Sequence, residues 1–267
     1  MCSGFQPERN IHLLFVPDEE IGGAEGMGAL LNSEQFKSIM PVAFAFDEGL
    51  ANPEDAFTVF YGERSPWWVY VKAQGPTGHG SRFVKDTATS KIVAICNKAL
   101  ALRDEQEKAL DTDSGFSQDG GTTHALNVIS TEAIAGFDIR VSPSMDMSAM
   151  KVKLDEWCAI EGVSWEFASW TNPLHEHYVT SLASDNVWWQ LFQKSCTRIG
   201  ERVETEVFPA ATDSRFLRKV GVPAIGFSPM KKTEILLHEH NESLSRVTFL
   251  HGISVYTAVF QDVVAYK

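Results

Sequence analysis

The sequence predicts an α/β protein in which one domain interrupts another. Apolar runs at 11–16 and 42–46 each end in acidic residues and enclose a helical stretch, which is the pattern of a βαβ unit. Between residues 67 and 167 the patterns follow the order strand, helix, two strands, helix, strand, which is that of a ferredoxin-like sandwich. Helix and strand patterns resume near residue 185. We therefore expect one domain in two parts, residues 1–63 and 181–267, and an inserted α+β domain at 64–180.

The first part holds two buried strands, at 11–16 and 42–46, with a helix at 24–31 between them. Gly22 and Gly23 allow the turn that separates the first strand from this helix. In open α/β sheets, ligands bind at the carboxyl ends of the strands. The acidic runs at 18–20 and 47–48 follow these two ends, so both should lie at one crevice.

The middle region begins with an alternating, half-exposed strand at 67–73. A long helix, a loop rich in Gly, Ser and Asp, two strands, a helix and a strand follow, at 87–110, 112–123, 128–129, 133–141, 145–160 and 163–167. The last part holds a helix, a strand and a closing helix, at 185–199, 222–227 and 249–264.

Composition narrows the class of protein. The net charge of −12 argues against nucleic acid and anionic membrane surfaces as partners. No apolar run reads as long enough to span a bilayer, and the first residues lack the pattern of a secretory signal. The four cysteines are scattered without metal-site spacing, which is typical of reduced thiols in the cytoplasm. We expect a soluble cytoplasmic protein.

The acidic run at 18–20 is the first candidate for chemistry. Negative charge at the end of a buried strand is costly unless water or a cation meets it. Adjacent glutamates can divide the work of metal-assisted hydrolysis, one holding the ion and the other moving protons. The alternative interpretation of Glu19 and Glu20 is a solvated cluster at a helix entry.

Seven motifs occur in a fixed order. They are PDEEIGG at 17–23, FDEG at 46–49, GHGSRF at 78–83, LNVI at 126–129, FDIRV at 137–141, PAATDSR at 209–215 and LLHEHNE at 236–242. Together they resemble the M20 family of di-zinc metallohydrolases, and the resemblance extends over almost the whole chain. It implies an incomplete zinc-peptidase-like catalytic domain, interrupted by a lid domain that forms a homodimer.

The resemblance also implies roles in the catalytic domain. Glu19 matches the general base, Glu20 a zinc ligand, Glu48 a ligand of the other zinc and His238 the histidine that closes the site. Asp47 is the rival of Glu48. His238 is preferred to His240 because the glutamate four residues later matches the family pattern H-x-x-x-E.

Four further residues match substrate-binding positions of the family. His79 matches a histidine that reaches across the dimer interface to the tetrahedral intermediate, and Thr212 matches a residue of the pocket. Asn127 and Arg140 match residues that bind polar groups of the substrate, an arginine fork being suited to a carboxylate. The alternatives are an ordinary turn for Asn127 and a sheet-surface ion pair for Arg140. His175 and His177 are expected to be surface residues, and His12 and His124 structural ones.

Part of the family pattern is missing. The H-x-D metal motif and the bridging aspartate should precede PDEE, and neither occurs, so three of the five usual ligands remain. The chain therefore resembles a carboxyl-terminal portion, with weak zinc binding, an exposed sheet edge and exposed apolar surface.

The implied activity is the zinc-dependent hydrolysis of N-acyl-L-amino acids to a carboxylate and a free amino acid, with two zinc ions in the complete family site. One alternative is another amidohydrolase or dipeptidase activity of the family. The other is a fragment or a non-catalytic dimerisation partner.

Overall fold

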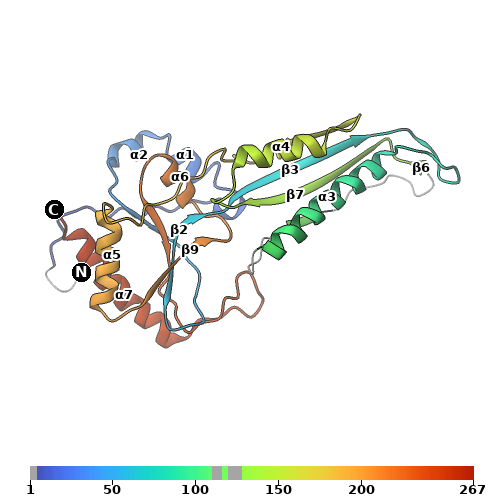
Figure 1. Cartoon of the computed structure of the whole chain (residues 1–267). Helices are drawn as coiled ribbons and strands as arrows, with labels where there is room; N and C mark the ends of the chain where they lie inside the picture. Colours follow the sequence, from blue (N-terminus) through green and yellow to red (C-terminus); the bar gives the residue numbers. More distant parts are fainter. Residues whose placement is uncertain (1–4, 110–115, 120–127) are drawn as a thin grey trace. The chain divides into compact units, whose positions relative to one another are not determined.

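The computed structural model describes residues 5–109, 116–119 and 128–267 (Figure 1). The chain divides into two compact units. The first unit joins Met1–Glu63 to Tyr178–Lys267, and the second comprises Arg64–His177. Both mix helices with sheets, so the predicted α/β class is confirmed.

A four-stranded sheet forms the centre of the first unit. Its order is β1 (Ala45–Asp47), β10 (Ala224–Phe227), β2 (Phe57–Glu63) and β9 (Val203–Phe208). β1 runs parallel to β10, β10 antiparallel to β2, and β2 parallel to β9. β1 is therefore an edge strand, and its carboxyl end carries Asp47.

Helices cover both faces of this sheet. On one face, α5 (Val187–Arg198) and α7 (Arg246–Val264) pack around aromatic side chains that include Phe192 and Phe227. On the other face, α1 (Met27–Leu30), α2 (Glu34–Ile39) and α6 (Ser214–Lys219) share a smaller core with Ala45 and Ala224. Successive strand residues point to opposite faces, so β1 and β10 each contribute to both cores.

Polar caps determine where three of these helices begin. The Ser33 hydroxyl accepts a hydrogen bond from the Phe36 amide at 3.1 Å at the start of α2. Asn186 caps α5 and Ser245 caps α7 in the same manner. Each cap satisfies amide donors that have no partner within the first helical turn.

The second unit is an antiparallel sheet with two helices. Its order is β5 (Phe116–Asp119), β7 (Glu132–Val141), β3 (Ser65–Gln74) and β8 (Val163–Phe167). The helices are α3 (Ala88–Ala109) and α4 (Met147–Trp157), and a short ribbon pairs β4 (Gly78–His79) with β6 (Val128–Ile129).

Alternation along β3 separates the two faces of this sheet. Trp67, Val69 and Val71 are buried against α3 and α4. Trp68 and Tyr70 lie on the opposite face, together with their cross-strand neighbours on β7 and β8. The alternating pattern at 67–73 thus predicts β3 correctly.

Residues 11–16 do not form the predicted buried strand. Leu13 and Phe15 are 76% and 88% exposed, and no strand is assigned there. A strand needs a partner for its amide and carbonyl groups, and within the described chain β1 pairs only with β10. The exposed apolar surface that the sequence predicts is present.

Four strands were not predicted from the sequence. They are β2, β4, β9 and β5, and β5 lies within residues 112–123, where a loop was expected. Cys96, Cys158 and Cys196 are free and buried, as expected of reduced thiols.

The sequence analysis expects no apolar run long enough to span a bilayer, and α7 differs from that expectation. It is the one helix of the described chain that is long and apolar enough, by length and composition alone, to cross a membrane. Val255, Val259 and Val263 on one side are buried in the core, whereas Val247 and Phe249 are exposed. The core-facing side explains part of this apolar composition.

Candidate active site

The loop of Glu19 and Glu20 is a single 3-10 turn, η1 (Glu19–Ile21), closed by two glycines. Gly22 and Gly23 have φ angles of 110° and 66°, which glycine adopts without strain. A β-carbon on Gly23 would lie 2.5 Å from Asp213 Oδ1, so the loop approaches the turn before α6 closely. The glycines thus bring PDEEIGG against PAATDSR.

Asp47 and Glu48 form the second acidic pair. The backbone amide and the hydroxyl of Ser214 both donate to Asp47 Oδ2 at 2.8 Å. Burial raises the pKa of Asp47, but hydrogen bonds from Glu48 and Ser214 outweigh it, and the pKa is lowered. The hydrogen bond to Asp47, together with burial, raises the pKa of Glu48 to about 8. Asp47 is therefore the more acidic of the two carboxyl groups.

Two further carboxyl groups are perturbed nearby. Burial raises the pKa of Asp213 to about 7, and its Oδ1 atom is buried without a hydrogen-bond partner among the described residues. Burial, and then the charge of Glu20, raises the pKa of Glu19. Clusters of perturbed groups are typical of functional sites, because catalysis needs such shifts.

A buried ionic network lies beside this cluster. Glu63, at the end of β2, contacts Arg218 Nη1 at 3.1 Å and Arg215 Nη1 at 3.9 Å. The Thr212 hydroxyl donates to Glu63 Oε2 at 3.0 Å. Arg215 donates to the carbonyl oxygens of Thr212 and Gly22, at 2.7 and 2.8 Å. One arginine therefore ties the loop of Glu19 to the turn of Thr212.

Thr212 itself is buried, with 3% of its surface exposed. Its hydroxyl also accepts a hydrogen bond from the Ser214 amide at 3.2 Å. Thr212 thus connects Glu63 to Ser214, which in turn donates to Asp47. Its side chain therefore helps to hold the acidic cluster in place.

The structure places Glu20 and His238 close together. Glu20 Oε2 lies 3.7 Å from His238 Nε2, and both side chains are largely exposed. His238 adopts a left-handed φ of 61°. In the described part of the chain, however, no group of three or more His, Cys, Asp or Glu residues could hold a metal ion. Because a zinc site needs about three protein ligands, the described residues do not fit a complete one.

The remaining predicted site residues belong to the second unit. His79 is exposed at the end of β4, and its Nδ1 atom lies 2.8 Å from the Ser81 hydroxyl. Arg140 forms an ion pair with Asp138 on β7, as the alternative interpretation has it. Asn127 lies outside the described residues, as does His124.

The other histidines differ in their surroundings. His12 is exposed and His175 packs its ring against Phe167, with 5.6 Å between ring centroids. His177 is half-buried and its Nε2 atom lies 2.9 Å from the carbonyl oxygen of Met145.

Sequence reasoning missed the residues that support the acidic cluster. Arg215 and Arg218 lie three residues apart on α6, one helical turn, and both reach Glu63. The sequence does carry one sign of this network, which is Glu63 at the end of the apolar run 57–62. A carboxylate buried there needs a cationic partner.

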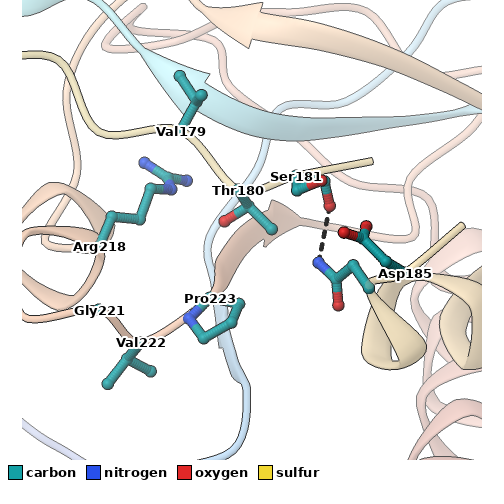
Figure 2. Close-up of a pocket in the computed structure, with 9 residues that line it drawn as sticks. Val179, Thr180, Ser181, Asp185, Arg218, Gly221, Val222 and Pro223 are labelled. Carbon is teal, nitrogen blue, oxygen red and sulfur yellow. Dashed lines mark hydrogen bonds between the residues drawn. The ribbon is translucent and has the colours of Figure 1, made fainter. Parts of the chain in front are cut away.

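Arg218 also lines a cavity of about 360 Å³ (Figure 2). Arg218 and Val222 line one wall, and Ser181 and Asp185 line another. The Asn186 side chain donates to the Ser181 carbonyl at 2.7 Å across this second wall. None of the predicted site residues lines this cavity.

The fold and the acidic cluster define a class of protein. The site combines paired carboxylates at a strand end with a partly buried glutamate of raised pKa and an adjacent histidine. These are the groups of a hydrolase that activates water.

The family follows from comparison with known proteins. The model of peptidase family M20/M25/M40 matches residues 2–262, and the chain therefore belongs to this family. The resemblance that the sequence motifs indicated is confirmed.

Curated relatives share over two fifths of the aligned sequence. Aminoacylase-1 of Dictyostelium discoideum is 43% identical over 283 residues, covering 98% of this chain and 68% of the relative. Human aminoacylase-1 is 44% identical over 268 residues, covering 95% and 64% respectively. The chain thus spans about two thirds of these relatives' length. These relatives support an amidohydrolase or peptidase function.

Solved structures resemble the fold at low identity. A tripeptidase from Staphylococcus aureus has a TM-score of 0.64 and 15% identity, covering 94% of this chain and 62% of that one. A dinuclear metal-binding M20 peptidase of Bacillus subtilis has a TM-score of 0.60 and 15% identity, covering 94% and 64%.

Proposed function

We propose that the chain serves the hydrolysis of N-acyl-L-amino acids to a carboxylate and a free amino acid. The observation that carries this proposal is Glu19, a partly buried glutamate with a raised pKa, next to the Glu20–His238 pair. The identity to aminoacylases supports the substrate class. A rival is another amidohydrolase or dipeptidase activity of the same family.

Glu19 is the proposed general base. A carboxylate with a raised pKa takes a proton from water more readily at neutral pH. The water oxygen adds to the amide carbonyl carbon, and the carbon–nitrogen bond then breaks. Glu19 returns the proton to the leaving nitrogen, which departs as an amine. Arg215 supports this role because it holds the Gly22 carbonyl at the end of the same turn.

Zinc is the proposed cofactor, with Glu20 and His238 as ligands of one ion and Glu48 as a ligand of the other. A bound zinc ion would lower the pKa of a water molecule to about 7. Glu20 and His238 alone cannot complete a site, so we expect weak binding.

The first experiment is hydrolysis of N-acetyl-L-methionine by the purified chain with added zinc, beside E19Q. Turnover that E19Q abolishes supports the proposal for this chain alone. No turnover by a folded chain contradicts it. Zinc titration by calorimetry is an independent measurement, in which E20Q and H238Q should each weaken binding.

The second candidate is a dimerisation partner without activity of its own, in the cytoplasm. Two observations favour it: the described residues do not form a complete metal site, and His79 is exposed. In this proposal the second unit forms the dimer and His79 completes the site of a full-length subunit. Mixing the chain with a full-length aminoacylase whose matching histidine is mutated should restore activity. A dimer without restored activity would contradict this role.

A further inference from the structure

The cavity that Arg218 lines lies wholly within the first unit. Its volume of about 360 Å³ falls near the lower end of the range of about 300–1,000 Å³ that is usual for pockets that bind small molecules. None of the proposed site residues is among those that line it. The cavity could therefore hold a ligand of its own, separate from the acidic cluster.

Arg218 has one donor group without a partner. Its Nε atom donates to the Ala224 carbonyl oxygen at 3.1 Å, and Nη1 donates to Glu63 Oε2 at 3.1 Å. Among the described residues, no hydrogen bond involves Nη2. Figure 2 shows the guanidinium group directed toward Val179 and Thr180, which also line the cavity. Because only 2% of the arginine side chain is exposed, an unpaired donor is costly there, and an acceptor in the cavity would remove that cost.

The charge of Arg218 favours a further anion. Burial lowers the pKa of Arg218, and the charge of Glu63 offsets this effect only in part. Glu63 is also shared, because Arg215 Nη1 lies 3.9 Å from its Oε1 atom. A ligand carboxylate that accepts a hydrogen bond from Nη2 would stabilise the charged form of the guanidinium group further.

The wall across the cavity carries the opposite charge. Asp185 lies there and is exposed, and it forms no ion pair with any described residue. Asn186 holds this wall in place, because its side chain donates to the Ser181 carbonyl oxygen at 2.7 Å and caps α5. A carboxylate in a fixed position is thus available for a cationic group of a ligand.

The rest of the lining is mainly apolar. Val179, Val222 and Pro223 contribute apolar side chains. The Thr180 hydroxyl is already used, since it donates to the Ala224 carbonyl oxygen at 2.6 Å and accepts from the Ala224 amide at 2.9 Å. A ligand that matches this cavity has a carboxylate, a cationic group and an apolar body.

We propose that the cavity binds a small zwitterion of the class of free α-amino acids with an apolar side chain. The ligand carboxylate accepts a hydrogen bond from Arg218 Nη2, its ammonium group faces Asp185, and its side chain contacts the apolar lining. This site goes beyond the proposed function and does not depend on it, because it uses only residues of the cavity. The proposed reaction releases a molecule of the same class, so the cavity is a second and separate site for it.

The experiment compares three ligands that share one apolar tail. L-methionine carries both charges, 4-(methylthio)butanoate lacks the ammonium group, and 3-(methylthio)propylamine lacks the carboxylate. Each is titrated into the full chain at neutral pH with EDTA present. Affinity at the cavity is measured as protection of segments 179–186 and 218–223, its two walls, against amide hydrogen exchange.

The two charges of the ligand should contribute unequally. The amine should bind about tenfold more weakly than methionine, because it loses a hydrogen bond to a buried cation. The butanoate should bind about threefold more weakly, because an exposed carboxylate such as that of Asp185 contributes little to a charge pair.

Three variants test the walls without altering Arg218, whose pair with Glu63 supports the fold. D185N should make methionine and the butanoate bind equally. S181W places a large side chain in the cavity and should abolish the protection by methionine. D104N is the matched control, because Asp104 is exposed on α3 of the second unit, and it should leave all three affinities unchanged. Circular dichroism verifies that each variant is folded.

Protection of both walls that is lost in S181W and kept in D104N would support the site. Equal binding of methionine and the amine would overturn the role of Arg218. A preference for methionine over the butanoate that persists in D185N would overturn the role of Asp185. Protection of residues 17–23 alone would place the amino acid at the loop of Glu19, and that result, or no protection at all, would overturn the cavity as a binding site. The hydrolysis assay of the proposed function is independent of each of these outcomes.

Discussion

Replacing Arg218 by methionine should strongly destabilise the first unit. Arg218 and Glu63 are both buried, with 2% and 4% of their side chains exposed, and Arg218 Nη1 lies 3.1 Å from Glu63 Oε2. The methionine fills a similar volume without charge. Glu63 then retains Arg215 at 3.9 Å and the hydrogen bonds from Thr212.

The magnitude follows from the geometry. Two unit charges 3.1 Å apart interact by about 5 kcal/mol at an effective dielectric constant of 20. Much of this attraction offsets the cost of moving both ions out of water, so the net contribution of the pair is small. Removing one partner leaves the other buried and poorly paired, which costs about 3–5 kcal/mol. Because Arg215 remains near Glu63, we expect a value near 3 kcal/mol for R218M.

The assay is urea unfolding followed by pulsed labelling of Cys196. This thiol is fully buried in the core of the first unit, so its labelling reports the unfolding of that unit. R198M is the matched control, because Arg198 pairs with Asp262 at the surface and its loss should cost less than about 1 kcal/mol. The double variant E63L/R218M should recover most of the loss. A cost for R218M as small as that for R198M would refute the reasoning.

Three more predictions concern the acidic loop and its surroundings. G23A should lower the thermal midpoint in a calorimetric scan, because φ of 66° is strained for alanine by about 1–2 kcal/mol and the new carbon would meet Asp213; an unchanged midpoint would contradict this packing. The pKa of Asp213 is about 7 in the folded protein against 3.8 normally, because burial disfavours its ionised form. The folded protein therefore loses stability as pH rises from about 3.8 to 7, where the unfolded chain ionises Asp213 more readily. In EDTA at pH 8, urea unfolding should therefore find D213N more stable by about 1–3 kcal/mol, with no gain at pH 3.5. Replacing exposed Leu13 and Phe15 by serine should reduce aggregation in light scattering without loss of stability, and equal aggregation would place the adhesive surface elsewhere.

Local patterns predict the second unit well. The alternation of Trp67, Val69 and Val71 with polar neighbours identifies β3, and the strand expected at 163–167 coincides with β8. Such patterns succeed when one face of a strand is buried and the other is not, because the side-chain period is then visible in the sequence. β2 is buried on both faces, and burial does not alternate along β9 either, so neither strand was recognised.

In the candidate site, too, some residues could be predicted from the sequence and others could not. The motifs indicate Glu19, Glu20 and His238. The structure brings Glu20 and His238 within 3.7 Å, although they lie far apart in the sequence. The support of the site could not be predicted in this manner. Glu63, Thr212 and Arg218 come from β2 and α6, and only packing makes them neighbours.

The sequence by itself determined the family, several of the helices and strands and the identity of the acidic groups, because these depend on residue types and local spacing. The tertiary structure alone decided that Ser214 holds Asp47, that Arg215 holds the loop of Glu19 and that Arg140 pairs with Asp138. It also decided that residues 11–16 are exposed. An apolar run becomes a buried strand only where another strand satisfies its backbone, and burial and pairing are properties of the assembled fold.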